Sequence, residues 1–163
     1  MKTVLLLRHA KASRDDPELA DHDRPLTDRG RRDARRIGRL MKDEGLAPDW
    51  WISSTAVRAR QTSELVAGIV ADPELVHHDR SLYLARPEAY IRVLRALPDE
   101  INSVIVVGHN PGLEDLVALL TGHDEHLPTA ALAVLTFPDK TWHRIGRPGS
   151  ADLVSTWRPK ELD

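Results

Sequence analysis

Two histidines and two arginines of this 163-residue sequence stand at or just beyond the ends of short aliphatic runs. Arg8 and His9 follow one run, Arg58 comes shortly after a second, and His109 follows a third. A neutral imidazole, with an ordinary pKa of about 6.5, is a competent nucleophile near pH 7. Guanidinium groups keep their charge and bind phosphate oxygens with paired hydrogen bonds. The four side chains together therefore suit phosphoryl transfer, in which one imidazole attacks phosphorus and the other groups bind the charged oxygens.

These side chains can meet only if the chain brings the ends of several strands together. The predicted strands are Val4–Leu7, Trp50–Ser53, Glu74–His78 and Ser103–Val107. Helical spacing of apolar residues predicts helices from the capping residue Thr27 to Gly45, over 55–70, from Pro87 to Leu97, and after Pro111 as far as Leu120. Such alternation predicts a three-layer α/β/α sandwich with a largely parallel central sheet, whose ligands bind beyond the carboxyl ends of the strands.

The last part of the sequence is expected to be less regular. Ala131–Phe137 and Thr141–Ile145 predict a terminal hairpin around Pro138 and Asp139, followed by an irregular tail. The four tryptophans are expected to pack in the core or at its edge. Because no linker or repeat divides the sequence, residues 1–163 are expected to form a single domain.

The composition restricts the class of protein. Hydrophobic residues at 41% and charged residues at 29% are typical of a soluble folded chain, and zero cysteines exclude disulfides, thiolate metal sites and cysteine nucleophiles. Val4–Leu7 is too short for a signal peptide or a membrane span, so a cytoplasmic location is expected. The net charge of −2 gives no overall attraction to nucleic acid or membranes, and we expect neither as a partner.

Four segments resemble motifs of the histidine phosphatase superfamily, in the same order, and span about two-thirds of the chain. The segments are Arg8-His9-Ala10, Leu26–Gly30, Ser53–Thr62 and Val107–Pro111. They are similar to the Arg-His-Gly signature, the Leu-Thr-x-x-Gly start of the first helix, the Ser-x-x-x-Arg-Ala-x-Gln-Thr segment and the second histidine motif. Two departures are Ala10 in place of glycine and Thr55 in place of the usual proline.

The resemblance implies a phosphoglycerate mutase-like fold and a hydrolase that needs no metal or other cofactor. It implies that His9 is the nucleophile that becomes phosphorylated, that Arg8 and Arg58 bind the phosphoryl group, and that His109 completes the pocket. Lys11 and Asn110 are further candidates for substrate binding, although solvation in a loop explains Lys11 equally well. The other histidines have no partners at convincing ligand spacing and are expected on the surface or in loops. These include the His77-His78 and His123/His126 pairs.

Departures from the mutase-like motif disfavour a phosphoglycerate mutase, and the short chain with its Gly108–Glu114 run resembles the SixA-type phosphohistidine phosphatases. Ala12 and Asp15 stand where mutase-like members have serine and asparagine. The obvious candidate acid is Glu88, but its place in a predicted first helical turn favours a capping role. A phosphoramidate needs this acid less than an ester does, because an imidazole ring can depart as a neutral group near pH 7. A phosphorylated protein is then the expected partner.

Two alternatives stay open at the level of sequence. The nearer one is a phosphatase of small metabolites such as sugar or nucleotide phosphates, with Glu88 or an unrecognised acid as the proton donor. The more distant one is a non-enzymatic phosphate-binding module, or an RNA-binding one that uses the arginines over 29–39. The second does not explain why a histidine stands at position 9. Asp23 and Arg24 are expected to form a structural ion pair with each other, and the alternative is that they brace the pocket.

Overall fold

The computed structural model describes residues 1–162, which build a six-stranded sheet between two layers of helices. The strands are β1 (Lys2–Arg8), β2 (Trp50–Ser54), β3 (Val76–Asp79), β4 (Ser103–Gly108), β5 (Leu132–Phe137) and β6 (Asp152–Trp157), in the spatial order β3-β2-β4-β1-β5-β6. The pairs β3/β2, β2/β4 and β4/β1 are parallel, whereas β5 is antiparallel to both β1 and β6. The mostly parallel sheet confirms the predicted architecture.

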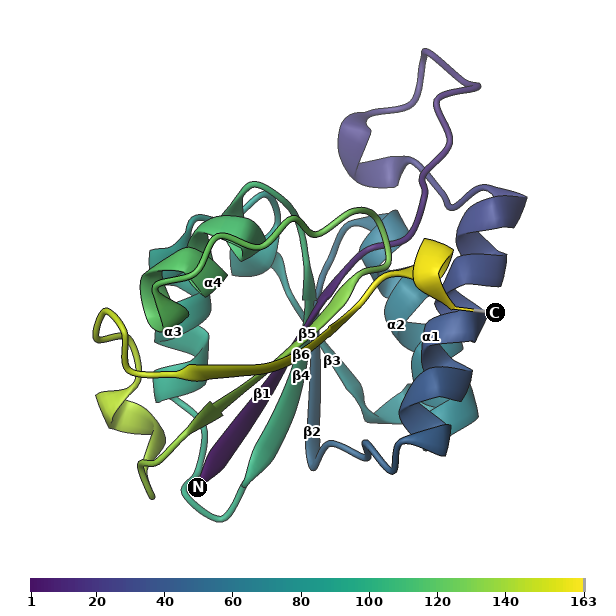
Figure 1. The fold of residues 1–163 in the computed structure, drawn as a ribbon. Helices are drawn as coiled ribbons and strands as arrows, with labels where there is room; N and C mark the ends of the chain where they lie inside the picture. The colour runs from purple at the N-terminus through teal and green to yellow at the C-terminus, as the bar shows by residue number, and fades with distance from the viewer. Residues whose placement is uncertain (163) are drawn as a thin grey trace.

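Helices cover both faces of the sheet (Figure 1). α1 (Asp28–Asp43) and α2 (Val57–Val70) lie on one face, and α3 (Pro87–Arg95) and α4 (Gly112–Thr121) lie on the other. The short 3-10 helices are η1 (Asp21–Asp23), η2 (Pro73–Leu75), η3 (Arg80–Leu82), η4 (Trp142–Arg144) and η5 (Pro159–Glu161). None of the helices within residues 1–162 is long and apolar enough to cross a membrane.

Alternating side chains of the central strands supply two separate cores. Leu6 of β1 and Val106 of β4 belong to the core under α3 and α4, whereas Leu5 and Val107 belong to the core under α1 and α2. Every residue of Val4–Leu7 is buried, as expected for a parallel strand that is covered on both faces. The continuous aliphatic runs therefore place β1 and β4 side by side in the middle of the sheet.

The predicted strand over Thr141–Ile145 is wrong, and so is the predicted irregular tail. Residues 142–144 form η4, and the second strand of the hairpin is β6. The burial of Trp142 and Ile145 imitates the alternation of a strand, but the indole of Trp142 is anchored locally, since its Nε1–H donates to the carbonyl of Ile101 over 2.7 Å. β6 is a partly exposed edge strand, so its apolar alternation is weak.

The first turn of α1 rests on the chain that follows His9. Thr27 caps this helix as predicted, because its Oγ1 accepts the N–H of Gly30 over 2.9 Å, and its own N–H donates to the carbonyl of Lys11 over 2.9 Å. A Cβ atom on Gly30 would overlap that same carbonyl oxygen. The glycine of the Leu-Thr-x-x-Gly segment is thus required by a close approach of two backbones.

We expect Gly30→Ala to lower the free energy of unfolding by about 1–3 kcal/mol, because the added methyl group displaces the backbone at Lys11. Gly68→Ala in α2 is the matched control, since a Cβ there meets only a Pro73 side-chain atom, at 3.5 Å. Alanine should stabilise that helix by roughly 0.5–1 kcal/mol. Urea denaturation measures both changes, and a Gly30→Ala protein as stable as the wild type would contradict this contact.

Candidate active site

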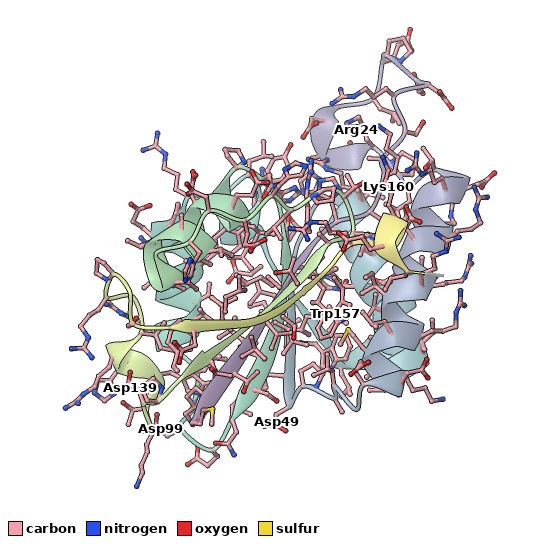
Figure 2. The ribbon with its side chains drawn as sticks, viewed as in Figure 1. Arg24, Asp49, Asp99, Asp139, Trp157 and Lys160 are labelled. Atoms are coloured by element: carbon pink, nitrogen blue, oxygen red, sulfur yellow. The ribbon has the colours of Figure 1, made fainter. Side chains whose placement is uncertain are left out.

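The carboxyl ends of β1, β2 and β4 meet at one edge of the sheet, and the residues beyond them line a pocket of about 220 Å³. Figure 2 shows Arg24 at this end of the molecule, and Asp49 and Asp99 at the opposite end of the sheet. The lining residues are Arg8, His9, Lys11, Ala12, Arg14, Arg24, Arg58, Leu84, His109, Asn110 and Thr129. The structure therefore brings together all six side chains that the sequence predicted for the site.

The two imidazoles face each other inside this pocket. The ring centroids of His9 and His109 lie 5.2 Å apart, and both side chains are buried. The Nδ1 atom of His9 lies 2.7 Å from the carbonyl oxygen of Ala10. Because a carbonyl can only accept, neutral His9 has its proton on Nδ1 and a free lone pair on Nε2. The nitrogen that is available for attack on phosphorus is therefore Nε2.

Side chains and backbone from neighbouring elements fix the orientation of His109. Its Nε2 lies 2.8 Å from the hydroxyl of Ser54, at the end of β2. Its main-chain N–H donates to the hydroxyl of Tyr90 in α3 over 3.1 Å. The Nδ1 atom lies 3.5 Å from a terminal nitrogen of Arg58. Nδ1 of His109 thus faces Arg58, while Nε2 contacts the end of β2.

Main-chain carbonyls hold the two predicted phosphoryl-binding arginines. Arg8 donates to the carbonyl of Leu127 over 3.1 Å, and Arg58 donates to the carbonyl of Asp21 over 2.8 Å. The Nε atoms of both arginines are buried and have no hydrogen-bond partner within residues 1–162. A buried guanidinium N–H without an acceptor is costly, and the oxygens of an anion are suitable acceptors.

Burial and positive neighbours keep both imidazoles uncharged. Burial lowers the pKa of His9 to about 3, and the charges of Arg58 and Arg8 act in the same direction. Burial lowers the pKa of His109 to about 3 as well, with His9 and Arg58 as further causes. At pH 7 the pocket therefore combines neutral imidazoles with charged guanidinium groups.

The Lys11 side chain is exposed to solvent, whereas the Asn110 side chain is fixed by hydrogen bonds. Lys11 is exposed at the pocket. The amide of Asn110 bonds the backbone at both ends, since it donates to the carbonyl of Leu127 over 2.7 Å and accepts the N–H of Glu114 over 3.3 Å. Asn110 thus connects the loop after β4 to the loop that also holds Arg8.

Sequence reasoning missed Asp21 and Tyr83, and it placed Arg24 at the pocket only as the less favoured of two alternatives. Arg24 lines the pocket, and its partner is Asp21, at 3.0 Å between the terminal nitrogen and Oδ1. The predicted pair between Asp23 and Arg24 is therefore wrong, and Asp23 instead contacts His22. Tyr83 donates its hydroxyl to the other oxygen of Asp21. The three-residue separation of Asp21 and Arg24 was the only local signal for this contact.

Other candidates of the sequence lie away from the pocket. Glu88 occupies the first turn of α3, as predicted, beside a groove that it shares with Ile91, Arg92 and Arg95. His77 stacks on Trp50, and His126 contacts Glu114 over 3.2 Å. In the part of the chain that the structure describes, no group of three or more histidines and carboxylates is arranged to hold a metal ion.

Comparisons with known proteins agree with this geometry. Residues 4–82 match the sequence profile of the histidine phosphatase superfamily (branch 1). An uncharacterized protein of Mycobacterium tuberculosis is 35% identical over 94% of this chain and 100% of its own length.

Two solved structures have the same fold. A SixA protein of Agrobacterium tumefaciens, assigned as a phosphohistidine phosphatase, is 33% identical over 97% of this chain and 99% of its own, with a TM-score of 0.81. The protein histidine phosphatase SixA in complex with tungstate is 26% identical over 99% of both chains, with a TM-score of 0.85. This chain is thus a phosphatase that belongs to the SixA-type branch of the histidine phosphatase superfamily.

Proposed function

We propose that this protein removes the phosphoryl group from phosphohistidine on a protein substrate, through a phosphohistidine intermediate on His9. The observation that carries the proposal is the pair of neutral imidazoles, 5.2 Å apart, in a pocket lined by four arginines and a lysine. No aspartate or glutamate belongs to the lining described above. The similarity to SixA proteins that are assigned to phosphohistidine supports the same substrate.

The first step transfers the phosphoryl group to the enzyme. The Nε2 lone pair of His9 attacks phosphorus in line, the P–N bond to the substrate breaks, and the departing ring takes up one proton from water. Arg8 and Arg58 bind the equatorial oxygens. The negative charge of the phosphoryl group favours protonation of His109, which then adds a third positive group.

The second step restores the enzyme. A water molecule attacks the phosphorus of phospho-His9, the P–N bond to His9 breaks, and inorganic phosphate is formed. The proton that this water releases balances the proton that the departing ring took up in the first step. The hydrogen bond from Nδ1 of His9 to the carbonyl of Ala10 keeps the ring in one orientation through both steps.

The absence of a carboxylate from the pocket lining bears on the choice of substrate. Departure of an alkoxide from a sugar phosphate needs a proton donor at the leaving oxygen. Glu88, the donor that the small-ester alternative requires, is exposed and lines a different groove. An imidazole leaving group has an ordinary pKa of about 6.5 and needs no such donor near neutral pH. The pocket therefore favours a phosphoramidate.

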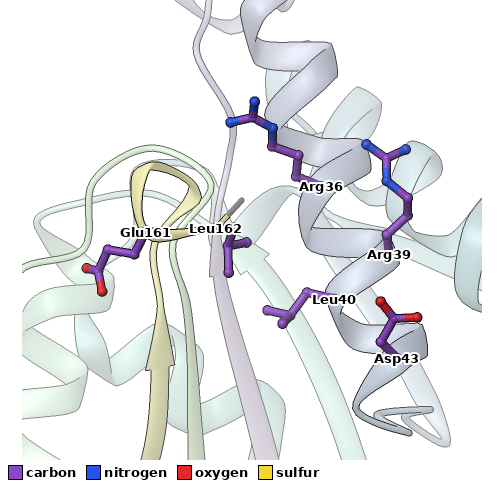
Figure 3. A pocket seen from close by; sticks show the side chains of 6 residues that line it. All are labelled: Arg36, Arg39, Leu40, Asp43, Glu161 and Leu162. Atoms are coloured by element: carbon purple, nitrogen blue, oxygen red, sulfur yellow. The ribbon is translucent and has the colours of Figure 1, made fainter.

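The arginines of α1 give less support to the distant RNA-binding alternative. Asp33 lies within 3.8 Å of both Arg29 and Arg36, and Arg31 pairs with Asp28. The groove between α1 and the C-terminal segment (Figure 3) combines two arginines with two carboxylates. Its lining residues are Arg36, Arg39, Leu40, Asp43, Glu161 and Leu162. Such mixed charge weakens the attraction for a polyanion.

His9→Ala should lower turnover by a factor on the order of 10⁴ or more, because the covalent route disappears. With a ³²P-phosphohistidine peptide, the wild type should carry an acid-labile label on His9. His123→Ala, in an exposed loop, is the control and should retain both turnover and label. Label on a different residue, or its persistence in His9→Ala, would refute the assignment of the nucleophile.

Neither imidazole should titrate between pH 8 and 5 in the anion-free protein, because the pKa values of His9 and His109 are lowered to about 3. The unfolded chain binds protons at both residues below its ordinary pKa of about 6.5, and the folded protein does not. Stability from these residues is therefore complete above that pH and is lost as the pH falls toward 3. Imidazole ¹⁵N NMR shifts against pH measure this, and a midpoint near 6.5 for both rings would contradict it.

A substrate panel tests the proposed function directly. At equal concentrations, phosphohistidine peptides should be hydrolysed with at least 10-fold higher kcat/KM than sugar or nucleotide phosphates, since only the esters need an acid in the pocket. Release of inorganic phosphate measures both classes. Preference for an ester would favour the small-metabolite alternative, and tight phosphate binding without any turnover would favour a binding module.

A further inference from the structure

The geometry points to Asp21 as a positioning residue that fixes the guanidinium groups of Arg24 and Arg58 from outside the pocket. The inference rests on the proposed function, because it takes these arginines as ligands of the phosphoryl group. Asp21 itself is not among the residues that line the pocket. It would act on the reaction only through the arginines that it holds.

The contacts of Asp21 reach both arginines at once. Its Oδ1 accepts from Nε of Arg24 over 3.1 Å and lies 3.0 Å from a terminal nitrogen of the same residue. Its Oδ2 accepts from Arg58 over 3.0 Å and from the hydroxyl of Tyr83. Its main-chain carbonyl accepts from the other terminal nitrogen of Arg58 over 2.8 Å. Asp21 therefore orients two guanidinium groups, and for Arg24 it does so together with the carbonyl of Ser13, which accepts from this arginine over 3.2 Å.

Charge balance explains why such a residue is needed. Within residues 1–162, Asp21 is the only carboxylate that pairs with any cation of the pocket lining. The side chain of Arg58 is only 3% exposed, so water does little to screen it from its cationic neighbours. The hydrogen bond from Tyr83 and the charge of Arg58 hold the pKa of Asp21 well below its usual range. The carboxylate is therefore charged near neutral pH.

The position of Asp21 depends on an excursion of the chain between β1 and α1. In Figure 1 this segment projects beyond the sheet edge and returns through η1. An isolated bridge between Ala12 and Leu26 closes its base, and His22 Nε2 lies 2.8 Å from the hydroxyl of Thr55, ahead of α2. The excursion is thereby tied to the segment that carries Arg58.

Asp21→Asn should weaken tungstate binding by about 10–100-fold and should lower kcat/KM by a similar factor. Loss of a residue that hydrogen-bonds a metal ligand has an effect of this size in metal sites. Asparagine keeps the size of the side chain, but its NH₂ group would face an arginine donor on one side. Asp23→Asn is the matched control, because this neighbouring carboxylate is 59% exposed and, among the residues that the structure describes, contacts only His22. It should change both quantities less than two-fold.

Calorimetric titration with tungstate and the melting temperature of the anion-free protein separate positioning from folding. The melting temperature of Asp21→Asn should fall, because the charged carboxylate pairs with two arginines in the folded state. Positioning predicts that tungstate affinity is lost even at temperatures where the variant is fully folded, with a smaller loss in Tyr83→Phe, which removes one hydroxyl from the same carboxylate. Wild-type affinity and kcat/KM in Asp21→Asn would overturn the proposal. If that variant does not fold, Tyr83→Phe decides in the same way.

Failure of the proposed function would look different. The wild type would then hydrolyse no phosphohistidine and carry no label on His9, while tungstate affinity would still fall in Asp21→Asn. Arg58→Ala is the reference in both cases, because it removes a ligand of the anion itself. It should reduce tungstate binding at least as strongly as Asp21→Asn does. Arg60→Ala, in the same helix and exposed, should leave tungstate binding unchanged.

Discussion

The positively charged side chains at the edge of the sheet repel one another, and the rest of the fold must hold them together against this repulsion. Arg8, Arg24 and Arg58 line one small pocket with two uncharged imidazoles, and the pocket lining contains no carboxylate. The main-chain carbonyl of Leu127 holds Arg8, and Asp21 holds Arg58 with both its main-chain carbonyl and its carboxylate. Rigid backbone at the site is therefore a requirement of its electrostatics, and the fully buried central strands supply that rigidity.

Both the parallel strand β4 and the segment that leads into the antiparallel strand β5 hold the backbone at Arg8 and His9. The parallel pairing of β1 with β4 brings Arg8 level with Gly108, which places the two histidine-bearing loops side by side. The segment before β5 then crosses this edge, and the N–H of Ala130 lies within 3.1 Å of the carbonyls of both Arg8 and His9. The backbone of His9 is thus held on one side by β4 and on the other by the segment that leads into β5.

The positions of residues that follow a local pattern could be predicted from the sequence. The positions of residues that depend on long-range contacts could not. The aliphatic runs of β1 and β4 encode burial directly, so the strands and the histidines at their ends follow from them. Asp21 meets Arg58 across 37 positions, and Tyr83 meets Asp21 across 62. The periodicity of the sequence does not indicate such contacts, because they depend on how the irregular segment between β1 and α1 folds back. β6 was missed for a related reason, since one face of an edge strand is free to be polar.

The polarity of the pocket also restricts the form in which a substrate can arrive. Five cationic side chains line the pocket in which we propose that the phosphoryl group binds. Mg²⁺ bound to a phosphate chain would cancel part of the negative charge that these side chains attract. A nucleoside triphosphate that arrives with bound magnesium is therefore attracted less strongly than the free anion. A phosphoryl group on a protein side chain, which carries no tightly held counterion, keeps its full attraction.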